Sequence, residues 1–239
     1  MSRILLWAFV VGLANIAGAL PVLGQRQAGR RTLHFLVGFG AGFMLAVALL
    51  EMLPQAFETE WGLTAVLLGY LAVHLTQHTL VPHFHFGEET HAEAMVSPGV
   101  GMLAVVGMLP HAFFDGVAIA SGHLVSVQLG MLIVVAVLLH KIPAGLSLAS
   151  ILLASGNSRR GTLLAVSGVA AATVVGAALT PLSELLVGYG LPLAAGVTLY
   201  VAASNLIPEA QRERGWLVPS GVFLGVAAFY VARMFMPGH

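Results

Sequence analysis

Two short motifs place polar residues beside prolines in otherwise apolar sequence. His111 and Asp115 lie in PHAFFDG, and His140 and Lys141 lie in HKIPAG. Asp115 is the only aspartate of the chain, and Lys141 is the only lysine. Imidazole and carboxylate groups bind borderline divalent cations such as Zn²⁺. The motifs therefore predict a mononuclear metal site formed by His111, Asp115 and His140, with one coordination position left open.

The spacing within each motif supports this interpretation. His111 and Asp115 are four residues apart, which puts both side chains on one face of a helix. Pro110 and Pro143 are expected to break their helices beside the polar residues, and irregular backbone at membrane depth is tolerated where it lines a cavity. Histidines that only hydrogen-bond between helices remain the structural alternative.

The composition is that of an integral membrane protein. The chain has 239 residues, of which 58% are hydrophobic and 8% are charged. A soluble domain is about one quarter charged. The absence of cysteine excludes disulfides, thiolate metal sites and cysteine nucleophiles. The net charge is zero and gives no reason to expect a nucleic-acid partner.

The apolar segments predict an all-α fold with eight transmembrane helices, because a span needs about 20 mostly apolar residues. The N-terminal apolar run is interpreted as a retained first helix and not as a signal peptide. The predicted helices cover residues 4–24, 33–54, 62–81, 98–121, 124–155, 162–186, 190–208 and 216–236.

A weak internal repeat suggests how these helices are arranged. LLEMLPQA, at residues 49–56, resembles ASNLIPEA, at residues 203–210, and the two copies lie on predicted helices that run in opposite directions. This is typical of an inverted repeat. It predicts a 3+2+3 arrangement, in which helices 1–3 and 6–8 are related and surround the central helices 4 and 5.

Arginine-rich loops predict the orientation in the membrane. The loops after helices one, five and seven carry most of the arginines and should face the cytoplasm, which leaves both termini outside. Residues 1–239 are expected to form one multi-pass transporter domain in a bacterial inner or plasma membrane. Residues 82–97 form a cytoplasmic loop rich in His and Glu, in which His83, His85 and His91 are candidate metal ligands. An ordinary polar connection is the equal alternative for this loop.

The motifs HAFFDGVAIA and HKIPAGLSLA resemble those of the ZIP (Zrt-/Irt-like protein) family of divalent metal transporters. LIPEA, the eight helices and the His-rich loop fit the same family over the whole chain. The resemblance implies metal uptake toward the cytoplasm, a site on helices 4 and 5 that often holds two metals, and His111, Asp115 and His140 as ligands of the first metal.

The sequence departs from the family pattern at the second metal. Ala144 stands where a bridging glutamate is usual, Ala112 where an asparagine is usual, and Lys141 where an acidic residue is usual. Glu184 is near the position of another ligand of the second metal. We therefore expect Lys141 to replace the second metal, with Glu184 as its first candidate partner and Asp115 as the next. An uncharged Lys141, or one whose stem reaches the interface, is the alternative.

The sequence thus predicts a secondary carrier for zinc, or for iron, manganese or cadmium, with the divalent cation as substrate and the lipid bilayer as its surroundings. His74, His78 and Glu209 are candidates for a cytoplasmic release path. A transport-impaired metal-binding or sensing protein of the same fold is the alternative, and a homodimer is left open. An enzyme is not expected, since the HExxH motif of metalloproteases is missing from the sequence.

Overall fold

The computed structural model describes residues 1–24, 30–77, 98–211 and 215–235, and within these residues the chain forms helices and short connections without a β-strand. Six of the described helical segments are long and apolar enough to cross a membrane, and two more are apolar but shorter. The chain is thus a multi-pass, all-α membrane protein over its described part. Its elements are α1 (Ser2–Leu23), α2 (Arg30–Val47), η1 (Ala48–Met52), α3 (Leu53–Phe57), α4 (Gly62–Leu75), α5 (Pro98–Val125), α6 (Val127–Ala154), α7 (Arg159–Leu179), η3 (Thr180–Leu182), α8 (Glu184–Leu199), η4 (Tyr200–Leu206), α9 (Ile207–Ala210) and α10 (Leu217–Phe235).

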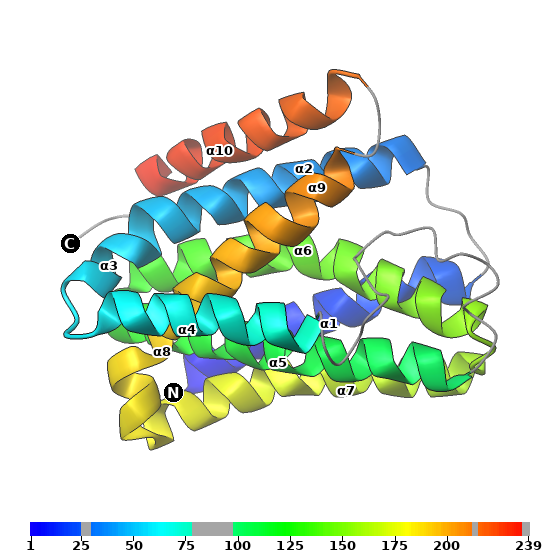
Figure 1. The fold of residues 1–239 in the computed structure, drawn as a ribbon, viewed down its shortest axis with the longest axis horizontal. Helices are drawn as coiled ribbons and strands as arrows, with labels where there is room; N and C mark the ends of the chain where they lie inside the picture. The colour runs from blue at the N-terminus through cyan, green and yellow to red at the C-terminus, as the bar shows by residue number, and fades with distance from the viewer. Residues whose placement is uncertain (25–29, 78–97, 212–214, 236–239) are drawn as a thin grey trace.

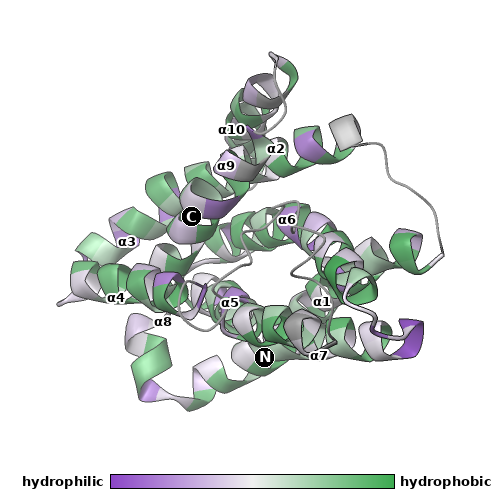
Figure 2. Cartoon of the chain, turned by 45° about the vertical axis from the view of Figure 1, so that its right-hand side comes forward, coloured by the Kyte–Doolittle hydropathy of each residue, from purple (hydrophilic) through white to green (hydrophobic). Residues whose placement is uncertain are grey.

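The long helices fall into two groups that lie side by side (Figures 1 and 2). In the first group, α5 packs on α6 and α7, and α1 packs on the same two helices. In the second group, α2 packs on α10, and α4 packs on α8. The groups meet where α5 contacts α8 and where α2 contacts α6. The two helices that carry the polar motifs, α5 and α6, therefore lie at the junction between the groups.

Glycines bring paired helices into close contact. A methyl group on Gly18 of α1 would collide with the carbonyl of Ile142 on α6, and one on Gly145 of α6 would collide with the carbonyl of Asn15 on α1. Small residues permit such close approach of helices in lipid. The same reciprocal contact joins α5 to α7, α2 to α10 and α4 to α8, at Gly116 and Gly176, Gly42 and Gly225, and Gly69 and Gly196.

Two long helical segments contain a π-helical turn shortly before a proline. α2 continues through η1 into α3, which has Pro54 in its first turn, and α8 continues through η4 into α9, which contains Pro208. Proline has no backbone N–H to donate, and a π turn accommodates the change in hydrogen bonding without ending the helix. The two distortions fall on the two segments whose sequences resemble each other.

Two expectations about helix breaks are wrong. Pro110 and Pro143 lie inside α5 and α6, and both helices remain continuous α-helix through them. Membrane helices tolerate proline where neighbouring helices satisfy the freed backbone groups. The actual break lies between α7 and α8, where Pro181 stands in η3 and the hydroxyl of Ser183 caps the N-terminus of α8. Glu184 therefore belongs to the first turn of α8 and not to the sixth helix.

Candidate metal centre

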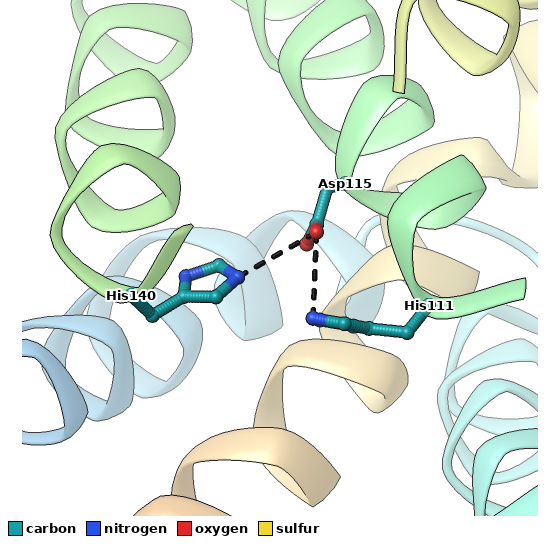
Figure 3. Close-up of side chains that lie close together, drawn as sticks. All are labelled: His111, Asp115 and His140. Atoms are coloured by element: carbon teal, nitrogen blue, oxygen red, sulfur yellow. Dashed lines mark ion pairs between the residues drawn. The ribbon is translucent and has the colours of Figure 1, made fainter. Parts of the chain in front are cut away.

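His111, Asp115 and His140 converge at the junction of the two helix groups. α5 supplies His111 and Asp115 from one face, and α6 supplies His140 from the opposite side (Figure 3). All three side chains are buried, and one ligand atom from each lies within 4.8 Å of the others. The i, i+4 spacing on α5 and the packing of α5 against α6 are together sufficient to form the cluster.

The distances match those between ligands of a small divalent cation. His111 Nε2 is 3.4 Å from Asp115 Oδ2, and His140 Nε2 is 3.5 Å from the same oxygen. Nitrogen and oxygen ligands of tetrahedral zinc at their usual bond lengths are separated by roughly 3.3–3.5 Å. Two of the three distances between the donor atoms therefore already have the length that a zinc site requires.

The backbone orients His140 for such a role. Its Nδ1 lies 3.1 Å from the carbonyl oxygen of Ala136, one turn earlier on α6. In the tautomer that donates this hydrogen bond, Nε2 presents its lone pair toward Asp115. A backbone carbonyl that fixes the tautomer is a common support for metal-binding histidines. The His111 and His140 rings are 5.3 Å apart between centroids, so both imidazoles face the same small space.

Lys141 pairs with Asp115 and not with Glu184. Its side chain has no exposed surface, and its Nζ is 2.7 Å from Asp115 Oδ2. Glu184 is instead exposed in the first turn of α8. The expected first partner is therefore replaced by the second candidate, because the helix break at Ser183 places Glu184 at the end of a helix while Lys141 is enclosed in the core.

Apolar packing surrounds the positions where the family pattern has further ligands. Ala112 and Ala144 are both buried and belong to one apolar cluster with side chains of α1, α5, α6 and α7, among them Met108 and Leu148. An alanine side chain has no oxygen or nitrogen atom, so neither position supplies a ligand where the family pattern has an asparagine and a glutamate. A second cation beside these alanines would be poorly coordinated.

The candidate release path is only partly described. His74 is exposed on α4, with its ring 5.8 Å from that of Tyr200 between centroids. Glu209 lies on α9, and nothing is described of its side chain. His78 and the loop residues His83, His85 and His91 lie outside the described residues.

Sequence reasoning missed two polar pairs on the second helix group. Arg233 Nε on α10 forms an ion pair with Glu51 Oε1 on η1 at 2.9 Å, and Asn205 Nδ2 on η4 donates to Gln77 Oε1 at 2.8 Å. The sequence signal was available, since Glu51 and Asn205 occupy equivalent positions in the two related segments. Their partners could not be found without the packing of α2 on α10 and of α4 on α8.

Comparison with known proteins agrees with the chemistry of the centre. The ZIP zinc transporter family profile matches residues 77–233. The proteins named zinc transporter ZupT from Salmonella newport, Salmonella typhimurium and Salmonella typhi are each 36% identical to this chain over 132 residues. Each alignment covers 49% of this chain and 49% of the relative, so the chain matches about half the length of these curated relatives. Because the family profile covers well over half of the sequence, the chain belongs to the ZIP zinc transporter family.

Proposed function

We propose that the protein carries a divalent cation across the membrane toward the cytoplasm, with zinc as the first candidate and iron, manganese or cadmium as others. The convergence of three buried donor atoms from two membrane-spanning helices carries this proposal. The relatives are named zinc transporters, which supports zinc. The matched family is one of transporters and not of enzymes.

The proposed site is mononuclear, with His111, Asp115 and His140 as ligands and a fourth position open to water or to a passing ligand. Lys141 takes the place of a second cation, since its ammonium group pairs with Asp115 at 2.7 Å. The buried apolar surroundings of Ala112 and Ala144 also support one metal and not two.

Glycine contacts support a 3+2+3 arrangement with inverted repeats. Gly42 of α2 contacts the carbonyl of Val222 on α10, and Gly196 of α8 contacts the carbonyl of Val66 on α4. The interval from Gly42 to Glu51 equals that from Gly196 to its counterpart Asn205. A pseudo-two-fold operation that exchanges α2 with α8 and α10 with α4 accounts for both contacts.

The central helices fit the same operation. Gly116 of α5 contacts the carbonyl of Thr173 on α7, and Gly145 of α6 contacts the carbonyl of Asn15 on α1. Each of the two glycines closes its motif at the same distance from the histidine, HAFFDG in one case and HKIPAG in the other. Inverted repeats of this kind allow a carrier to expose one central site to either side in turn.

Residues 1–239 would then act as one transporter domain in an inner or plasma membrane, with both termini outside the cytoplasm. The loop at residues 82–97, together with His74, His78 and Glu209, would receive the cation on the cytoplasmic side. Arginine-rich loops and the clustered histidines of the sequence support this direction.

Flux into proteoliposomes with a panel of divalent metals tests the proposal. We expect uptake of zinc by the wild type and at least a tenfold loss in His111→Ala. His123→Ala is the matched control, since His123 lies on the same helix outside the three-residue cluster and contacts the Ile119 carbonyl. No uptake of any metal by the wild type, or equal loss in both variants, would refute the proposal.

A further inference from the structure

One oxygen of Asp115 is shared by three nitrogen-bearing side chains. Lys141 Nζ is 2.7 Å from Oδ2, and the Nε2 atoms of His111 and His140 are 3.4 and 3.5 Å from it. A zinc ion bound to that oxygen at about 2.0–2.2 Å would lie within about 5 Å of the ammonium nitrogen. Lys141 has no exposed surface, so little solvent screens the two positive charges. Metal and ammonium therefore compete for one carboxylate.

The empty centre is electrically balanced by the same contact. Asp115 carries one negative charge, Lys141 carries one positive charge, and neutral imidazoles add none. Without Lys141 the carboxylate would be buried and unpaired at membrane depth, which is strongly unfavourable. The ion pair lets the unloaded centre stay closed, since it contains no net charge that must be solvated.

We propose that Lys141 is a tethered stand-in for the transported cation, an inference that rests on the proposed transport function. In the empty carrier Lys141 neutralises Asp115 and permits the unloaded protein to reorient. When a metal binds, its charge displaces the ammonium group from Oδ2, which lowers the affinity and favours release. The device depends on competition between two cations for one carboxylate. Because Lys141 follows His140 directly on α6, its ammonium group stays close to the metal site after it leaves Oδ2.

This role differs from that of a lysine that only stabilises the fold. A structural lysine would affect loaded and empty carriers equally. A stand-in is needed most in the empty carrier, so its removal should impair net uptake, which requires return of the unloaded site, more than exchange, in which the site is always loaded.

The principal test compares the two modes of flux in the same proteoliposomes, using Lys141→Leu. Net uptake is followed with a zinc indicator inside zinc-free vesicles, and exchange is followed with radioactive zinc in vesicles preloaded with unlabelled zinc. We expect the variant to bind zinc at least tenfold more tightly in detergent, and its loss of net uptake to exceed its loss of exchange by at least tenfold. An unchanged ratio of net uptake to exchange, or an unchanged affinity, would overturn the proposal.

Lys141→Arg decides the matter if the leucine variant does not fold. A guanidinium group keeps the charge and holds a carboxylate with two parallel hydrogen bonds, so it is a stronger competitor than the ammonium group. We expect at least threefold weaker zinc binding in a variant that elutes as a single species in detergent. Zinc affinity equal to or above that of the wild type would refute charge competition. Failure of the proposed transport function is distinguishable, because the wild type itself would then show neither exchange nor net uptake.

Discussion

α5 and α6 carry similar motifs at the same register but differ at the two positions that decide the charge of the centre. Each helix presents a histidine, His111 or His140, and each is held by a glycine against an outer helix. Asp115 of α5 has Ala144 as its counterpart on α6, and Lys141 of α6 has Ala112 as its counterpart on α5. The comparison shows that two related helices can present equivalent imidazoles while one helix supplies the acid and the other the base of a single ion pair.

The same contrast extends to the second helix group. Glu51 and Asn205 occupy equivalent π-helical turns, and each is bound by a residue near the end of the packed partner helix. One pair is ionic and the other is a neutral amide pair. The shared backbone geometry is therefore compatible with different charges. The following variants test whether charge or packing determines stability and metal binding at each place.

The largest effect on stability is expected from breaking the ion pair between Asp115 of α5 and Lys141 of α6, the feature in which the two helices differ. Asp115→Ala leaves Lys141 buried without a partner and should lower the free energy of unfolding by about 3–5 kcal/mol. Asp115→Ala combined with Lys141→Leu should cost less than the sum of the single changes, as measured by unfolding in detergent. Glu184→Ala is the control and should change little, since Glu184 is exposed. Additive losses would show that the two residues are not coupled.

An added methyl group should destabilise the packing of α5 and of α6 by similar amounts. Gly116→Ala and Gly145→Ala each force a methyl group against a neighbouring carbonyl, and each should cost about 1–3 kcal/mol. Gly168→Ala is the matched control, because a methyl group at Gly168 meets no atom within 4 Å among the described residues, and alanine favours the helix by up to about 1 kcal/mol. Thermal unfolding in one detergent compares the three variants. A neutral effect at either crossing would argue against equivalent packing.

The two histidines should contribute similarly to metal binding. His111→Ala and His140→Ala should each weaken zinc binding about tenfold or more, which corresponds to about 1.4 kcal/mol, because each removes one of three ligands. Titration calorimetry on purified protein gives both affinities. Wild-type affinity in both variants would exclude the site, and a loss confined to one of them would show that the imidazoles are not equivalent.

The smallest effect is expected at the outer pair of the second group. Glu51→Gln removes an ion pair whose arginine is 49% exposed, so the free energy of unfolding should fall by no more than about 1 kcal/mol. Asn205→Asp, which places a carboxylate at the equivalent turn, is the companion variant. Chemical unfolding monitored by tryptophan fluorescence is sufficient for both. A loss above about 2 kcal/mol in Glu51→Gln would mean that lipid and protein shield this pair from water.

Local patterns in the sequence were sufficient to predict the membrane class, the all-helical fold and the shared face of His111 and Asp115. Hydropathy and i, i+4 spacing depend on neighbours along the chain, and so they can be recognised without a fold. The HxxxD and HK motifs also identified His140 as a partner, and the structure brings the three side chains together. Their role as metal ligands stays a prediction.

The tertiary structure decided which charges meet. Lys141 pairs with Asp115 and not with Glu184 because the cap at Ser183 starts α8 at Glu184, which leaves Glu184 exposed in the first turn, whereas close packing of α6 encloses Lys141. The partner of Glu51, Arg233, was likewise fixed by the crossing of α2 and α10. Distances between helices depend on how each helix is rotated and how closely glycines allow it to approach, and no pattern within a single helix determines either quantity.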